Sequence, residues 1–134
     1  MQERINVLVG EDDPNDRLIL QRTFRKVWPE VHVELLPSGL AVLDHLKAES
    51  SPVPSLIILD TLTARMTGWA VLEWLQAHPT LAKVPVVMLT GQATEKDKLR
   101  AEALGAKAYL EKPQEVSELQ LLLKSLDQFW QPAG

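Results

Sequence analysis

Acidic, hydroxyl and basic side chains follow the apolar runs of this 134-residue chain. Glu11 and Asp12 come after the first run, Asp60 after the third, Thr90 after the fourth and Lys112 after the fifth. If they converge, two carboxylates about 4 Å apart repel by roughly 4 kcal/mol at an effective dielectric near 20. Lys112 and a divalent cation can offset that repulsion, and an all-oxygen site with room for water and phosphate favours Mg²⁺, with Mn²⁺ as an alternative. Such a pocket suits phosphoryl transfer, which needs positioning and charge neutralisation more than proton chemistry.

The elements that position these side chains alternate along the chain. Three of the apolar runs, INVLV, LIIL and VPVVML, are apolar on successive residues, which is typical of strands covered on both faces of a parallel sheet. The predicted strands are Ile5–Val9, Val31–Leu35, Leu56–Leu59, Val84–Leu89 and Ala108–Leu110.

Amphipathic stretches between these runs predict helices. Asp16–Val27 and Val116–Trp130 each carry a one-sided apolar stripe, and Ser38 and Thr94 are expected to cap helices that begin after them. A further helix is expected to carry Trp69 and Trp74. The order predicts an α/β fold, a doubly wound (βα)5 three-layer sandwich with a five-stranded parallel sheet. Such sheets place their chemistry at the carboxyl ends of the strands.

Composition excludes several functional classes. The formal net charge of −4 and the lack of a Lys/Arg-dense stretch argue against nucleic-acid binding. The chain has no cysteine, so a disulfide framework or a thiolate metal site is excluded. No stretch has the length of a membrane span, and the first apolar run is too short for a signal peptide. A cytoplasmic location is therefore expected.

Each candidate residue also has an ordinary structural interpretation. Asp13 followed by Pro14 can be a helix cap, an aspartate that ends a strand is commonly turn chemistry, and a Lys-Pro pair is commonly surface. Taken singly, these interpretations are the more frequent ones. Taken together, separate strand ends carry the residue types that one reaction needs, and this favours function.

The chain resembles the receiver domain of two-component response regulators, a CheY-like family, over essentially its whole length. VLVGEDDPND is similar to the family's first strand and acidic pair, and PSLIILD to the strand that delivers the phosphoacceptor. VVMLTG and GAKAYLEKP are similar to the segments that carry the switch hydroxyl, the switch aromatic residue and the lysine. The resemblance implies the strand order 2-1-3-4-5 and a cis bond before Pro113.

The resemblance also implies a mechanism. Asp60 would accept a phosphoryl group from a phosphohistidine of a sensor histidine kinase. Asp12, Asp60 and the backbone carbonyl of Leu62 would bind Mg²⁺, with Glu11 acting largely through water. Lys112 would neutralise the phosphoryl oxygens.

The same resemblance implies a conformational switch. Thr90 would move toward the phosphoryl group, and the ring of Tyr109 would enter the space that Thr90 leaves. The readout surface would be the fourth helix, the fifth strand and the fifth helix. The domain would catalyse only its own phosphorylation and dephosphorylation.

The whole chain, 1–134, is expected to be one receiver domain with a short aromatic tail at 129–134 and no fused output domain. Phe129 and Trp130 either pack on their own domain or form a dimer or partner surface. This end of the chain and EDDPNDRLIL resemble the single-domain regulators paired with bacterial phytochromes, so a bacteriophytochrome is a candidate kinase.

The sequence has three rival interpretations. A phosphatase of the haloacid-dehalogenase type would need an aspartate where Leu62 stands, and a dinucleotide-binding domain would need a glycine fingerprint after the first strand. The serious alternative is a pseudo-receiver, an interaction module that works without phosphorylation. Such modules usually lose the acidic pair, the phosphoacceptor or the lysine, and this chain retains all of them.

Overall fold

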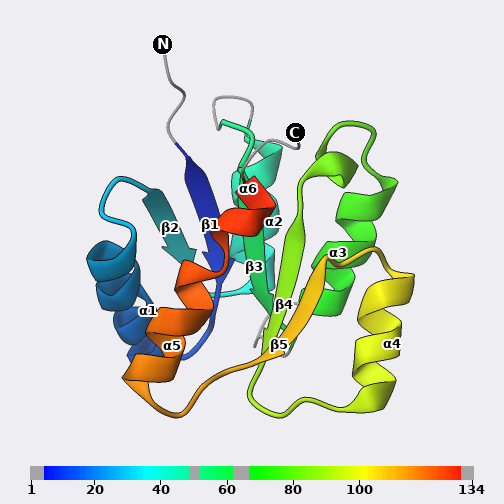
Figure 1. Cartoon of the computed structure of the whole chain (residues 1–134). Coiled ribbons are helices and arrows are strands. Elements are labelled where there is room, and N and C mark those ends of the chain that lie inside the picture. Colours follow the sequence, from blue (N-terminus) through cyan, green and yellow to red (C-terminus); the bar gives the residue numbers. More distant parts are fainter. Residues whose placement is uncertain (1–4, 49–51, 62–66, 131–134) are drawn as a thin grey trace.

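The computed structural model of the protein describes residues 5–48, 52–61 and 67–130, and its centre is a parallel sheet of five strands. The strand order is β2-β1-β3-β4-β5, as expected (Figure 1). The strands are β1 (Asn6–Gly10), β2 (His32–Leu36), β3 (Leu56–Asp60), β4 (Val86–Thr90) and β5 (Ala108–Glu111). Every residue of β3 and β4 is buried, which confirms that their continuous apolar runs mark strands covered on both faces.

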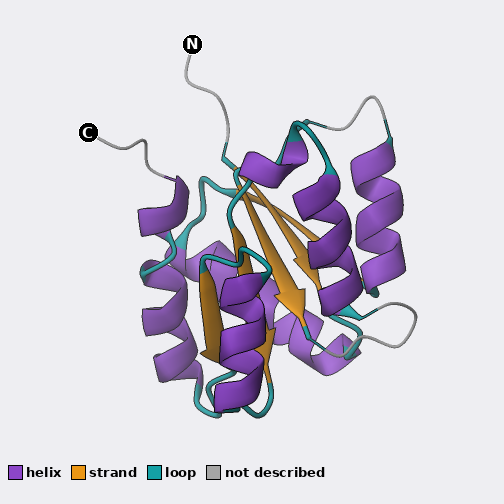
Figure 2. Cartoon of the chain, turned by 90° about the vertical axis from the view of Figure 1, so that its right-hand side faces the viewer, coloured by secondary structure: helices purple, strands orange, loops and turns teal. Residues whose placement is uncertain are grey.

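Helices cover both faces of this sheet and complete three layers (Figure 2). They are α1 (Pro14–Val27), α2 (Gly39–Lys47), α3 (Gly68–Ala77), α4 (Glu95–Ala103), α5 (Val116–Lys124) and α6 (Asp127–Trp130), with a 3₁₀ turn, η1 (Leu81–Lys83). Apolar side chains of α1 and α5 share one core cluster with the sheet, whereas those of α2, α3 and α4 share the other. The doubly wound α/β fold is thus confirmed.

Short polar side chains fix where the helices begin. The Asp13 carboxylate accepts hydrogen bonds from the backbone amides of Asn15 and Asp16, and Pro14 is the first helical residue, so α1 begins two residues earlier than predicted. Ser38 and Thr94 cap α2 and α4, as expected. These caps place the first turns of the helices next to the carboxyl ends of the strands.

The last predicted helix is interrupted. Its apolar stripe predicts one helix over Val116–Trp130, but α5 ends at Lys124 and α6 begins at Asp127. The Ser125 hydroxyl donates a hydrogen bond to the Leu122 carbonyl at 2.6 Å, a local bond that competes with continued helix. The turn directs α6 back toward α1, where the rings of Trp28 and Trp130 meet edge to face with centroids 5.1 Å apart.

A cation–π contact connects α3 and α4 on the opposite side of the sheet. The Trp69 ring is 6% exposed, and the guanidinium of Arg100 lies 4.3 Å from its centroid. Within the described ranges, no helix combines the length and the apolar character needed to cross a membrane.

Candidate functional site

Three carboxylates meet at the carboxyl ends of the central strands. Glu11 follows the last residue of β1, and Asp60 is the last residue of β3, which pairs with β1 in parallel. One carboxylate oxygen from each of Glu11, Asp12 and Asp60 lies within 4.8 Å of the others. Glu11 and Asp60 are buried, and Asp12 is half-buried. The sheet topology therefore brings together the acidic residues that the sequence singled out.

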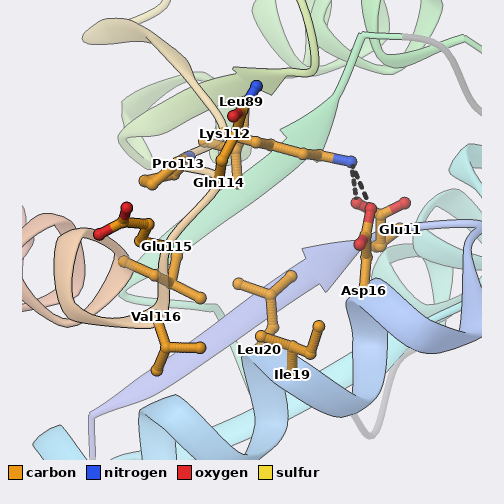
Figure 3. Close-up of a pocket in the computed structure, with 11 residues that line it drawn as sticks. Glu11, Asp16, Ile19, Leu20, Leu89, Lys112, Pro113, Gln114, Glu115 and Val116 are labelled. Carbon is orange, nitrogen blue, oxygen red and sulfur yellow. Dashed lines mark hydrogen bonds and ion pairs between the residues drawn. The ribbon is translucent and has the colours of Figure 1, made fainter.

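Lys112 supplies the counter-charge to this cluster. Its Nζ donates hydrogen bonds to Oδ2 of Asp60 at 2.8 Å, to Oδ2 of Asp16 at 3.2 Å and to Oε1 of Glu11. Figure 3 shows the side chain extended from the end of β5 toward Glu11 and Asp16. The backbone amide of Lys112 donates to the Thr90 carbonyl at 2.7 Å, which fixes the start of the side chain beside β4. All three donors of the ammonium are directed at carboxylates.

Burial and pairing shift the protonation of both partners. Burial raises the pKa of Glu11 from 4.5 to about 7, although hydrogen bonds from Lys112 and from the Asp13 amide partly oppose the shift. Burial disfavours the Lys112 ammonium, but hydrogen bonds to Asp60 and Glu11 outweigh this effect and raise the pKa of Lys112 above its usual value. Lys112 therefore carries a positive charge throughout the physiological pH range, whereas Glu11 gains or loses its proton near neutral pH.

The donor set fits a hard divalent cation. Glu11, Asp12 and Asp60 offer only oxygen ligands and carry more negative charge than Lys112 alone can balance. Mg²⁺ binds such sites through one or two carboxylates and keeps several waters, so three converging carboxylates suffice. The Leu62 carbonyl, expected as a further ligand, lies outside the described residues.

Two hydroxyl groups adjoin the cluster at the end of β4. Thr90 is buried, and its Oγ1 accepts a hydrogen bond from Oγ1 of Thr61 at 3.2 Å. The backbone amide of Gln92 lies 3.4 Å from the same Thr90 oxygen. The predicted switch hydroxyl thus lies beside the strand end that carries Asp60, and it has a partner, Thr61, that sequence reasoning did not identify.

Tyr109 is half-buried on β5 and packs against the core cluster of α2, α3 and α4. Its hydroxyl accepts a hydrogen bond from the Thr94 amide at 3.2 Å, at the start of α4. The Glu111 carboxylate accepts one from the Ala93 amide at 2.7 Å. The loop between β4 and α4 is therefore attached to β5 at two successive amides.

A hollow of about 310 Å³ opens between α1 and α5 beside the cluster (Figure 3). Glu11, Asp16 and Lys112 contribute to its lining, together with apolar side chains of both helices. Ile19 and Val116 belong to this lining and are 42% and 53% exposed. The hollow thus joins a charged site to an accessible apolar surface.

Two further expectations concern β5–α5 and the C-terminal aromatic residues. The prediction of a cis peptide bond before Pro113 was wrong, because the described residues contain no cis peptide bond. The trans isomer is the lower-energy form of a bond that precedes proline. Phe129 and Trp130 are half-buried against the core cluster of α1 and α5, so part of each ring packs on its own domain.

A model of the response regulator receiver domain matches residues 7–124 of the chain. The chain belongs to this family. As a receiver domain it is similar to the response regulator Rcp1 of Synechocystis sp. (strain ATCC 27184 / PCC 6803 / Kazusa), with 29% identity over 92% of this chain and 87% of the relative. It is a receiver domain of the kind found in two-component systems, with a CheY-like fold.

Solved receiver structures agree with this assignment. The phosphorylated cyanobacterial phytochrome response regulator RcpA superposes with a TM-score of 0.86 at 25% identity, over 96% of this chain and 94% of that one. The Mn²⁺-bound form of Rcp1 gives a TM-score of 0.83 at 28% identity, over 96% and 99% of the two chains. The sequence-based recognition of a receiver domain, similar to the single-domain phytochrome regulators, is confirmed.

Sequence reasoning missed two side chains of this receiver site, Asp16 and Thr61. Asp16 has the appearance of an ordinary acid in the first turn of a helix, and Thr61 that of a turn residue. The only signal for Asp16 was the additional acid in EDDPND, four residues after Asp12.

Proposed function

We propose that the protein is a response regulator that accepts a phosphoryl group on Asp60 in a Mg²⁺-dependent reaction. One observation carries the proposal: the Asp60 carboxylate accepts a hydrogen bond from the ammonium of Lys112 at 2.8 Å and lies within 4.8 Å of carboxylate oxygens of Glu11 and Asp12. One oxygen of Asp60 is thus held by a cation, and an oxygen-ligand site for a second cation adjoins it.

The donor would be a phosphohistidine of a sensor histidine kinase. An Asp60 oxygen attacks phosphorus in line, forming the O–P bond as the N–P bond to histidine breaks. Asp12 and Asp60 would hold the Mg²⁺, with Glu11 acting through water, and the ion supplies charge neutralisation for the phosphoryl oxygens. Lys112 would move its hydrogen bond from Asp60 to a phosphoryl oxygen, and Thr90 would donate another.

The signal would be a change in the attachment of α4. When Thr90 donates to the phosphoryl group, it gives up its hydrogen bond to the Gln92 carbonyl, and space opens beside β4 for the Tyr109 ring. The Tyr109 hydroxyl would then release the Thr94 amide. Reversing a two-state equilibrium from about 1:99 to 99:1 needs around 5.5 kcal/mol, which a few charge-assisted hydrogen bonds can supply.

The hollow between α1 and α5 suits the kinase. A helix of the donor that packs on Ile19 and Val116 would bring its phosphohistidine to the adjacent carboxylates. Because the chain resembles regulators of phytochromes, a bacteriophytochrome is the candidate donor, and the transfer would take place in the cytoplasm.

The chain would act as a single receiver domain, 1–134, and a homodimer would use α4, β5, α5 and the exposed parts of Phe129 and Trp130.

Incubation with acetyl phosphate and Mg²⁺, followed by intact-mass spectrometry, tests the proposal. The wild type should gain the mass of one phosphoryl group, and EDTA should prevent the gain. Asp60→Asn should remain unmodified, whereas Asp44→Asn, an exposed acid on α2, should behave as the wild type. An unmodified wild type would instead support the pseudo-receiver alternative.

A further inference from the structure

We propose that Asp16 is a positioning residue that holds the Lys112 ammonium in the site during phosphoryl transfer. The inference rests on the proposed function, because it assigns a role in the reaction at Asp60. It concerns a contact between the first turn of α1 and the end of β5: Oδ2 of Asp16 lies 3.2 Å from Nζ of Lys112.

The position of Asp16 is fixed by the start of α1. Its backbone amide donates to the Asp13 carboxylate at 3.2 Å, and Pro14 begins the helix directly after that cap. The side chain is therefore presented from a rigid first turn rather than from a loop. Figure 3 shows it beside Glu11, pointing toward the end of Lys112.

Asp16 differs from the other two partners of Lys112 in what else it can bind. Among the described residues, the carboxylates close enough to share a metal ion are those of Glu11, Asp12 and Asp60. Glu11 and Asp60 must therefore serve both a cation and the ammonium. Asp16 is outside that group, and the side chain that its carboxylate contacts within the described part of the chain is Lys112.

This difference matters when the phosphoryl group arrives. Asp60 then commits one carboxylate oxygen to the O–P bond and no longer carries a carboxylate charge, and Glu11 faces the divalent cation. The side chain of Lys112 is a flexible chain of four carbons, and it becomes disordered easily once its ammonium has no fixed partner. With Asp16 in place, one donor of the ammonium stays anchored while another turns to the phosphoryl oxygen.

Removing the charge of Asp16 should slow the transfer step. The Asp16 side chain is 41% exposed, so its ion pair with Lys112 is partly screened by water. We therefore expect the rate of phosphoryl transfer at saturating Mg²⁺ to decrease by about fivefold. The dissociation constant for Mg²⁺ should change less, by about twofold, since Asp16 is not a ligand. A rate effect without a matching affinity effect is what separates positioning from metal binding.

The test compares Asp16→Asn, Asp16→Glu and Asp97→Asn with the wild type. Asp97 lies in the first turn of α4, so its variant controls for the loss of an acid at a helix start. Acetyl phosphate at saturating Mg²⁺ gives the rate, and calorimetry gives the Mg²⁺ affinity. Asp16→Asn should be slow, Asp16→Glu should recover most of the rate, and Asp97→Asn should match the wild type.

A second measurement shows whether Asp16 acts through Lys112. In a Lys112→Met background, Asp16→Asn should cause no further slowing. Equal slowing in both backgrounds, or no slowing in either, would overturn the inference.

NMR of the Lys112 ammonium tests the anchor without phosphorylation. Asp16→Asn should lower the order of the Nζ group, and an unchanged order would refute the anchoring. A wild type that takes up no phosphoryl group would refute the proposed function, and the NMR result would still decide whether Asp16 anchors Lys112.

Discussion

The ammonium of Lys112 lies 2.8 Å from a carboxylate oxygen of Asp60, although β4 separates their two strands in the sheet. The long lysine side chain spans the end of β4 and reaches β3. This contact, together with those to Glu11 and Asp16, places one positive charge among three carboxyl groups. The site is therefore short of positive charge, and its stability should depend on cations.

Removal of that amine should destabilise the protein at neutral pH. Lys112→Met leaves the buried Glu11 without its counter-charge, and we expect a loss of about 2 kcal/mol in the free energy of unfolding, limited because Glu11 can take up a proton. Urea denaturation at pH 7.5 without divalent cations measures the loss. Lys124→Met, at the end of α5, is a control that should change little.

A divalent cation should stabilise the wild type. At a Mg²⁺ concentration 100 times the dissociation constant, the free energy of unfolding should rise by about 2.7 kcal/mol. Asp12→Asn should weaken the Mg²⁺ affinity at least about tenfold, as measured by calorimetry. Asp13→Asn is the matched control: Asp13 caps α1, and asparagine caps equally well, so the Mg²⁺ affinity should stay close to that of the wild type.

In the absence of metal, the free energy of unfolding should decrease as the pH rises from 4.5 to about 7, the range over which Glu11 loses its proton. The folded protein holds the Glu11 proton more tightly than the unfolded chain, with a pKa of about 7 against 4.5. Its contribution is therefore fully present below pH 4.5 and is lost as the pH rises to about 7. Urea titrations across this range should show a smaller fall for Glu11→Gln than for the wild type. Identical profiles for the two proteins would contradict the shifted pKa.

The Tyr109 hydroxyl should protect one backbone amide. Tyr109→Phe removes the acceptor of the Thr94 amide, and hydrogen exchange at Thr94 should accelerate by about threefold, since a single partly exposed hydrogen bond contributes little. Phosphorylation of the wild type should have the same effect, and Thr90→Ala should suppress it. Unchanged exchange at Thr94 after phosphorylation would argue against the Tyr109 switch.

The contact between Trp28 and Trp130 should stabilise the monomer. Trp130→Ala should cost about 1–2 kcal/mol, and a double-mutant cycle with Trp28→Phe should give a coupling energy of about 1 kcal/mol. Sedimentation at several protein concentrations shows whether Trp130→Ala also changes self-association. A coupling near zero would show that the contact with Trp28 does not stabilise the monomer.

The strands and most of the site follow from local sequence patterns, because continuous apolar runs mark the strands and the chemistry begins where each run ends. The role of Asp16 could not be predicted in this way, since its contact with Lys112 depends on how α1 packs on the sheet and not on the residues next to it in the sequence. The break after α5 was also missed. The apolar stripe continues through it, and the competing hydrogen bond of Ser125 becomes evident only in three dimensions.

The packing of Trp69 under Arg100 gives this protein a built-in optical reporter. An indole shielded from water and touched by a guanidinium emits differently from one that loses either condition. Because Arg100 belongs to α4, a displacement of that helix would change the emission of Trp69 without any attached dye. Activation kinetics could then be followed in the unlabelled protein, with Trp69→Phe to identify the source of the signal.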